Sequence, residues 1–215
     1  WIFLDSIVSH FYSSVGQIVL GIYRGATTVA IYALAIQLKS LFTSFSTALN
    51  SVLLPKVTAL AAREGTENEI SDLFIRVGRL QYFVMSFILV GFIIFGKEFI
   101  ILWGGEDYVQ TYYITLIIMI PFFFDLISNV GIVVLQAKDK LKYRSAPMIM
   151  ISLIGLMLTF PFANYFGIYG CACAISISIF VSNVLVSNFV FYKIAEIDVV
   201  MYWKQVMGMS FFPLF

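Results

Sequence analysis

The chain has 215 residues, of which 61% are hydrophobic and only 12% are charged. Soluble domains carry roughly 25% charged residues, so a soluble fold could not bury this much apolar surface and a polytopic membrane protein is predicted. The net charge of +1 gives no reason to expect a nucleic acid as partner. Cys171 and Cys173 are too few for a disulfide framework or a complete metal site.

Six complete apolar segments are long enough to cross a bilayer, because about 20 helical residues span a hydrocarbon core of roughly 30 Å. Their approximate ranges are 2–22, 27–54, 80–103, 109–136, 145–165 and 169–192, with a tight turn at 164–167 between the last two. We therefore expect an all-α fold, a six-helix transmembrane bundle over 1–193. A linker and a truncated next transmembrane helix are predicted over 194–215. This truncation, and a start at Trp1 without Met, lead us to expect a fragment of a longer protein.

Residues 66–79 connect the second and third segments and carry a helix-start signal. Thr66 to Glu69 match the S/T-x-x-E capping box, in which the first and last side chains satisfy each other's backbone amides. Apolar residues then recur at helical spacing: Ile70, Leu73, Phe74, Val77 and Leu80. An amphipathic helix lying in the cytoplasmic membrane interface is predicted.

Basic residues are distributed unevenly between the two ends of the predicted segments. Placing the loop 138–144 in the cytoplasm and alternating sides leaves only Arg24 and Lys97 outside, as the positive-inside rule favours. The ten basic residues inside are Lys56, Arg63, Arg76, Arg79, Lys138, Lys140, Lys142, Arg144, Lys193 and Lys204.

Lys39 and Asp125 are the two charged residues deep within predicted segments. A charge at the bilayer centre costs about 2.5–3.5 kcal/mol by the low estimate, so each needs a wet cavity or a partner. In the functional interpretation Lys39 binds an anion, and Asp125, with Asn129 one turn later, binds a coupling cation or proton. In the alternative, the two side chains pair, or each is neutralised and packed between helices. Pro121 either frees carbonyl oxygens for an ion or only bends its helix.

Two polar stripes lie at helical spacing on the first two segments. The first comprises His10, Ser14 and Gln17, which could relay protons but more often face a bundle interior. The second comprises Lys39, Thr43, Ser46 and Asn50. The polar residues predicted to line a cavity beside Lys39 are His10, Gln17, Gln37 and Asn50.

Motifs for covalent chemistry are missing from the sequence. It contains no nucleotide-binding glycine loop, no HExxH, no GxSxG and no long loop that could hold a catalytic domain. We expect a protein that is not an enzyme and has no metal site or cofactor, with coupling to a Na+ or H+ gradient left open.

Five sequence segments occur in an order and spacing typical of one known family. They are GIYRGATTVAIYALAIQL (21–38), LLPKVTAL (53–60), LWGGEDY (102–108), VLQAKDKLKYRS (134–145) and YFGIYGCACAISIS (165–178). Together they resemble the polysaccharide (O-antigen type) flippases of the multidrug/oligosaccharidyl-lipid/polysaccharide exporter superfamily. The resemblance covers nearly the whole chain and is to the C-terminal half of such proteins.

The resemblance implies a MATE-like fold of two six-helix lobes, with this chain as one lobe facing a missing N-terminal lobe of the same chain. It implies that an undecaprenyl-diphosphate-linked oligosaccharide is flipped across the bacterial inner (cell) membrane by alternating access, for surface polysaccharides such as lipopolysaccharide O-antigen. Its relatives draw on an ion gradient. Lys39, and Arg24 near the outer mouth, would attract the diphosphate, and Asp125 would serve the coupling ion.

Three alternatives remain. A multidrug or other cation-coupled exporter of the same superfamily would share the helix count but have an acid-dominated cavity. An integral membrane polysaccharide polymerase or ligase would need a large outer loop bearing Arg or His, whereas the predicted outer loops are short. A purely structural scaffold would explain neither Lys39 nor Asp125.

Overall fold

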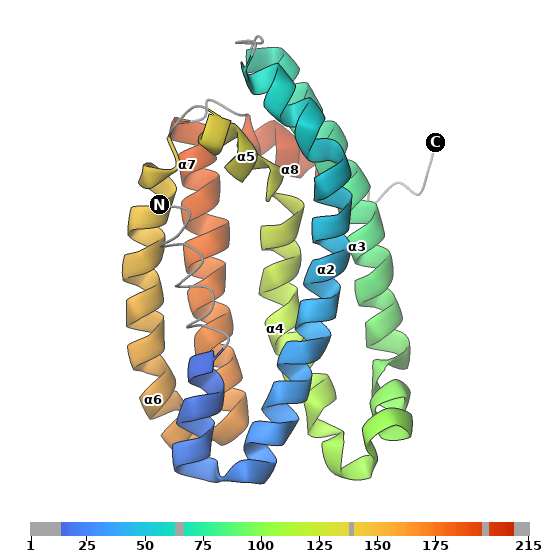
Figure 1. Ribbon diagram of the computed structural model, residues 1–215, viewed down its shortest axis with the longest axis vertical. Coiled ribbons are helices and arrows are strands. Elements are labelled where there is room, and N and C mark those ends of the chain that lie inside the picture. The colour runs from blue at the N-terminus through green and yellow to red at the C-terminus, as the bar shows by residue number, and fades with distance from the viewer. Residues whose placement is uncertain (1–13, 63–66, 138–139, 195–197, 209–215) are drawn as a thin grey trace.

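The computed structural model describes residues 14–62, 67–137, 140–194 and 198–208, and every regular element within them is a helix (Figure 1). Residues 14–24 are helical and lead through Gly25, whose φ is 84°, into the first labelled helix. The labelled helices are α2 (Ala26–Ala62), α3 (Glu67–Gly104), the 3-10 helix η1 (Glu106–Tyr108), α4 (Gln110–Ile127), α5 (Val130–Ala137), α6 (Lys142–Ile179), the π-helix η2 (Phe180–Val186), α7 (Ser187–Lys193) and α8 (Val199–Gly208).

Four helical stretches of the described chain are long and apolar enough to cross a membrane. They are Ala26–Ser51, Asp72–Gly104, Glu106–Ile127 and Lys142–Lys193. The predicted class, an all-helical membrane protein, is therefore confirmed. The count of six spans and the MATE-like lobe stay predictions, and the segment predicted over 2–22 lies largely outside the described residues.

The longest of these stretches, Lys142–Lys193, is not one straight helix. Gly167 has φ 63° and ψ −142°, a left-handed backbone conformation that residues with a side chain rarely adopt. The chain reverses there, so that the first part of α6 and the segment through η2 and α7 lie side by side (Figure 1). The turn predicted at 164–167 is confirmed at Gly167.

The segment predicted as one span over 109–136 is interrupted. α4 ends at Ile127, and a turn at Ser128 and Asn129 leads into α5. Ser128 Oγ donates to the carbonyl oxygens of Phe124 and Asp125 at 3.1 Å each, and such local bonds compete with helix continuation. The break is not at Pro121, which lies inside α4. As a result Asp125 lies in the last turn of its helix rather than at the middle of a span.

α2 and α3 are longer than the segments predicted for them. They contain 37 and 38 residues, or about 55 Å each at about 1.5 Å per residue. The amphipathic helix predicted over 66–79 is helical from Glu67 but continuous with α3. Together the two helices project beyond one end of the bundle (Figure 1).

Among the described residues, Arg79, Lys140, Arg144 and Lys193 lie toward that end of the bundle, and we call it the basic end. There Lys140 Nζ donates to the carbonyl of Ile194 at 3.0 Å, and Arg79 donates to the side chain of Gln205 at 2.5 Å. At the opposite end Arg24 donates to the carbonyl of Asn164 at 2.8 Å. These contacts agree with the predicted alternation of loops between two ends, and which end faces the cytoplasm stays a prediction.

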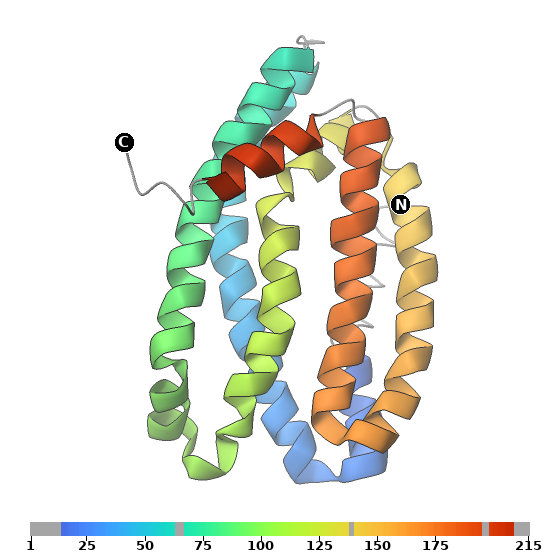
Figure 2. The ribbon, with the colours of Figure 1, turned by 180° about the vertical axis from the view of Figure 1, so that it is seen from behind.

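α8 lies across the basic end instead of beginning a new span (Figure 2). Asp198 Oδ1 accepts a hydrogen bond from the backbone N–H of Met201 at 2.9 Å, which is a helix N-cap interaction. Tyr202, fully buried, donates its hydroxyl to the carbonyl of Ile127 at 2.8 Å. The transmembrane helix predicted within 194–215 is therefore a ten-residue crosswise helix over its described part.

Two apolar clusters form the interior. The one toward the basic end includes Phe74, Phe123 and Tyr202, and the one toward the opposite end includes Tyr32 and Ile114. Phe123 belongs to the first cluster, whereas the preceding Phe122 packs against the second. The side chains around Phe122 therefore lie at the boundary between the two clusters.

Candidate functional site

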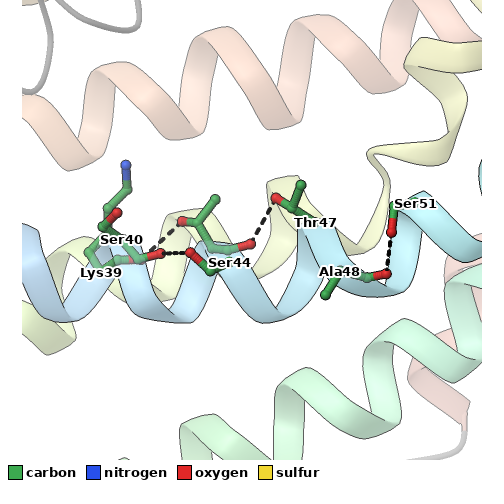
Figure 3. Close-up of a pocket in the computed structure, with 7 residues that line it drawn as sticks. Lys39, Ser40, Ser44, Thr47, Ala48 and Ser51 are labelled. Carbon is green, nitrogen blue, oxygen red and sulfur yellow. Dashed lines mark hydrogen bonds between the residues drawn. The ribbon is translucent and has the colours of Figure 1, made fainter.

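A polar groove of about 360 Å³ runs along one face of α2 (Figure 3). We call it the α2 groove. Its lining residues are Lys39, Ser40, Thr43, Ser44, Thr47, Ala48 and Ser51. They recur three and four positions apart, so the helix presents them on one side. This is an uncommon surface for the second half of a stretch, Ala26–Ser51, that is apolar enough to span a membrane.

Four of the five hydroxyl groups in the lining of the α2 groove bond to their own helix. Thr43 donates to the carbonyl of Lys39 at 3.0 Å, Ser44 to that of Ser40 at 2.9 Å, and Thr47 to that of Thr43 at 3.0 Å. Ser51 donates to the carbonyl of Ala48 at 2.8 Å. The hydroxyl hydrogens of these four residues are thus satisfied within α2, which lowers the cost of placing the groups in a membrane segment. The oxygen lone pairs remain available as acceptors.

Lys39 provides the one charge in the lining of the α2 groove. Its Nζ lies 3.9 Å from the ring centroid of Phe122 on α4, a distance at which an ammonium is attracted to the face of an aromatic ring. The side chain is half-buried and interacts electrostatically with Asp125. Figure 3 shows it extending away from the axis of α2. Lys39 therefore lies against the bundle, at the inner end of the groove.

Asp125 is buried and is held by a residue from the π-helix. Its Oδ2 accepts a hydrogen bond from Asn183 Nδ2 at 3.1 Å. Arg144 and Lys39 both interact electrostatically with the carboxylate. Arg144 is itself buried and donates from Nε to the hydroxyl of Ser187 at 2.8 Å. We call Asp125, Arg144, Asn183 and Ser187 the Asp125 cluster.

The Asp125 cluster joins four elements. Asp125 is on α4, Arg144 near the start of α6, Asn183 on η2 and Ser187 at the start of α7. A π-helix is rare and is often found at functional positions, because the extra residue in a turn redirects side chains. In this protein the π-helix η2 carries Asn183, whose side-chain amide donates to Asp125.

The structure brings together two of the residues predicted from the sequence, Lys39 and Asp125. Among the described residues the hydrogen-bond partner of Asp125 is Asn183, not Lys39. The simple alternative, in which Lys39 and Asp125 pair only with each other, is therefore incomplete. Asn129, predicted to share the face of Asp125, lies in the turn after α4 instead.

The other predicted site residues lie away from this centre. Gln37 is exposed and Asn50 half-buried on α2, and neither lines the groove. Gln17 is half-buried in the helix over 14–24, and His10 lies outside the described residues. Arg24 is exposed at the opposite end, where it caps the chain near Gly167. The roles predicted for these residues stay predictions.

Three residues of the Asp125 cluster were missed from the sequence. Arg144 was assigned to a cytoplasmic loop by its basic neighbours, although it is 4% exposed in the structure. Asn183 and Ser187 lie in a mostly apolar segment, each beside one other polar residue (Ser182 and Asn188), and match no motif. One available signal was the amide of Asn183, since a polar side chain in the middle of a spanning segment usually has a partner.

The chemical character of the α2 groove is set by its lining residues. The α2 groove offers one cation and several hydroxyl acceptors. Within the described ranges, no three residues among His, Cys, Asp and Glu are grouped closely enough to hold a metal ion. The arrangement is suited to an anionic ligand that also carries polar groups.

Comparison with known proteins identifies the family. The sequence model described as polysaccharide biosynthesis protein matches residues 1–113, which is more than half of the chain and includes the whole α2 groove. Searches of curated proteins and of solved structures returned no match. The matched part contains the α2 groove and two of the stretches long and apolar enough to span a membrane, Ala26–Ser51 and Asp72–Gly104. This chain therefore belongs to the polysaccharide biosynthesis protein family.

Proposed function

We propose that this protein is a transporter that flips an undecaprenyl-diphosphate-linked oligosaccharide across the bacterial cytoplasmic membrane, for surface polysaccharides of the O-antigen type. The observation that carries the proposal is Lys39, a cation at the inner end of a polar groove in a membrane-spanning helix. An ionised side chain in the middle of a spanning stretch, as Lys39 is, is tolerated where water or a ligand reaches it. A diphosphate is such a ligand, and the family is one of polysaccharide biosynthesis.

The transport cycle in this proposal is alternating access between two lobes. The helices described here form one lobe of a MATE-like pair, and the α2 groove faces the second lobe. Rocking of the lobes would expose the groove first to the cytoplasm and then to the outside. The resemblance to the C-terminal half of O-antigen flippases supports this arrangement, and so does the charge of Lys39 in the groove lining, which would be costly against lipid.

Energy coupling through Asp125 is part of the same proposal. A Na+ or H+ gradient is the candidate energy source. Arg144 and Lys39 both face the carboxylate, and their positive charges oppose the approach of a further metal cation. The same positive charges also oppose protonation of Asp125, so they do not select between a proton and Na+ as the coupling ion. Protonation of Asp125 would remove the negative charge facing Lys39 and leave the ammonium free to attract a diphosphate.

The rival functions fit the groove less well. A multidrug exporter of cations would present acidic groups to its ligand, whereas the lining of the α2 groove contains a lysine and no acid. A polymerase or ligase would place catalytic groups in a loop outside the membrane. The charged clusters found in the described residues lie within the helices instead. We therefore propose that the protein is not an enzyme.

Replacing Lys39 tests the proposal. In proteoliposomes containing a fluorescent undecaprenyl-diphosphate oligosaccharide, Lys39→Ala should reduce flipping to the protein-free rate, because the groove loses its only cation. Lys39→Arg should retain part of the activity, since it keeps the charge. Lys97→Ala is the matched control, because Lys97 is exposed on α3 outside the groove. Full flipping by Lys39→Ala would reject Lys39 as the substrate anchor.

A further inference from the structure

The hydrogen-bond state of the α2 groove carries information about its ligand. The hydroxyl hydrogens of Thr43, Ser44, Thr47 and Ser51 are all directed to carbonyls of α2. Their oxygens are therefore presented as acceptors, and the ligand has to supply the donors. The donors of the groove lie at its other end, where the ammonium of Lys39 has three donors and no acceptor and the hydroxyl of Ser40 lies next to it in the chain. The groove thus combines one anion-binding end with an acceptor surface.

Sugar hydroxyls and a phosphate match these two parts. The hydroxyl groups of a neutral sugar can donate to Ser and Thr oxygens, and a phosphate accepts from the ammonium of Lys39. Lys39 and Ser51 are 12 positions apart, or about 18 Å along α2 at about 1.5 Å per residue. This length suits an oligosaccharide better than a single sugar.

We propose that the α2 groove is a glycan track that selects neutral sugars, with the phosphate held at Lys39 and the sugar chain extending toward Ser51. The inference rests on the proposed function and adds an orientation and a specificity to it. Ser51 lies at the end of the candidate span, on the side where α2 and α3 project. The sugar chain therefore points toward the basic end, and the phosphate lies deeper in the membrane.

The selection of neutral sugars follows from electrostatics. Along the part of the groove that would hold the sugar chain, a uronic acid or another acidic sugar would bring a carboxylate against the oxygens of Thr43, Ser44, Thr47 and Ser51, whose hydrogens are already donated to α2. Such a group would lose its water without gaining a partner, which is unfavourable at a site of low polarity. Beyond Lys39, the lining of the groove contains no cation that could compensate it.

The test measures binding of three probes to the purified full chain in lipid nanodiscs. The probes are polyprenyl diphosphate, the same lipid bearing a neutral oligosaccharide, and the same lipid bearing a uronic-acid oligosaccharide of equal length. The test variant is Thr43→Val combined with Thr47→Val, which removes two acceptors but keeps side-chain shape. The matched control is Thr28→Val, because Thr28 on the same helix also bonds to a carbonyl four residues earlier and lies outside the groove.

The double variant should bind the neutral glycolipid at least about tenfold more weakly, as expected for two lost hydrogen bonds, and bind bare polyprenyl diphosphate unchanged. The control should bind both probes as the wild type does. The wild type should prefer the neutral over the uronic-acid glycolipid. Equal affinity for those two glycolipids, unchanged binding of the neutral one by the double variant, or equal loss of all probes would each overturn the glycan track.

Lys39→Ala separates this inference from the function on which it rests. If the track fails but Lys39→Ala still weakens binding of bare polyprenyl diphosphate, the proposed function stands without the track. If Lys39→Ala leaves binding of all three probes unchanged, the phosphate anchor is wrong and both proposals fall.

Discussion

Asp125 is a buried carboxylate with an amide on one side and two cations facing it. Asn183 donates to it, and Arg144 and Lys39 supply the compensating charge. Removing one member of a buried charge group is costly, because the remaining charges keep their desolvation penalty without their partner. The carboxylate therefore holds η2 and the start of α6 against α4, and it also fixes the electrostatic environment of Lys39.

Asp125→Asn should lower stability and remove the coupling to an ion gradient. We expect a loss of about 3–5 kcal/mol, typical of breaking a buried ion pair, because Arg144 and Lys39 would face a neutral amide. Thermal unfolding in detergent measures the first effect. The second is measured by flipping in proteoliposomes with and without an imposed gradient, and a preserved gradient response would reject Asp125 as the coupling residue.

Two further variants show whether the loss comes from charge. Asp107→Asn is the control, since Asp107 is exposed in η1. Adding Lys39→Met to Asp125→Asn removes one of the two uncompensated cations, so the double variant should recover roughly 0.5–3 kcal/mol, the usual range for directly interacting residues. If the effects of Lys39→Met and Asp125→Asn on the free energy of unfolding were strictly additive, the attraction between Lys39 and Asp125 would be negligible.

At the scale of elements, α8 acts as a brace across the basic end (Figure 2). The ring of Tyr202 lies 4.2 Å from that of Phe74 on α3, centroid to centroid, and its hydroxyl bonds to the end of α4. Trp203 Nε1 donates to Asn188 Oδ1 on α7 at 2.9 Å. Burial raises the pKa of Tyr202, so its hydroxyl stays protonated and remains a donor at neutral pH. Through these contacts α8 connects α3, the end of α4 and α7.

Tyr202→Phe should destabilise the protein by about 0.5–1.5 kcal/mol, because it removes one hydrogen bond to Ile127 but keeps the ring packing. The measurement is the midpoint of thermal or denaturant unfolding. Tyr165→Phe, at an exposed position, should have no effect. If the two variants behaved alike, the hydroxyl bond would not contribute to the brace.

Gly78→Ala tests the contact between α8 and α3. A Cβ at Gly78 would overlap the ring of Tyr202, so α8 should be displaced and its amides should exchange faster with deuterium. Gly91→Ala on the same helix is the matched control. It meets no atom within 4 Å and should be neutral or slightly stabilising, since Ala favours a helix over Gly. Equal exchange in both variants would contradict close packing at Gly78.

At the scale of the whole molecule, the proposed mechanism needs water in the α2 groove and lipid on the outer faces of the bundle. The exposed side of α3 carries large apolar residues such as Phe87, which is 77% exposed. On α2 the groove between Lys39 and Ser51 carries hydroxyls instead, whereas Leu41 and Phe45 are exposed outside the groove lining. The charged ammonium of Lys39 in the α2 groove would be costly against acyl chains, so we expect the groove to face a wet cavity.

Cysteine labelling checks this contrast. In a variant with Cys171 and Cys173 replaced by Ala, Thr47→Cys should react with a water-soluble maleimide, and an added polyprenyl-diphosphate glycolipid should slow the reaction. Phe87→Cys, on the apolar face of α3, should stay unlabelled because a lipid-embedded thiol is neither hydrated nor ionised. Equal labelling at the two positions would show that the groove is not a separate aqueous surface.

Several features of the fold and the site could be predicted from the sequence because they depend on local composition. The apolar segments define a membrane protein, and Gly167 marks a turn since only glycine adopts its φ readily. Of the polar stripe predicted on the second segment, Lys39 and Thr43 line the groove, whereas Asn50 does not and Ser46 is buried and accepts a hydrogen bond from Gln81. Each of these signals lies within a single segment of the chain.

Tertiary structure decided which segments meet. The partner of Asp125 is 58 residues away, and Arg144 bonds to Ser187, 43 residues away, so no spacing rule connects them. The end of α4 at Ile127 and the crosswise course of α8 depend on each other through Tyr202. The sequence by itself determined that charge lies inside a membrane segment, because hydropathy is a local property. Only the packed bundle decided which side chains compensate that charge, because pairing depends on which helices lie side by side.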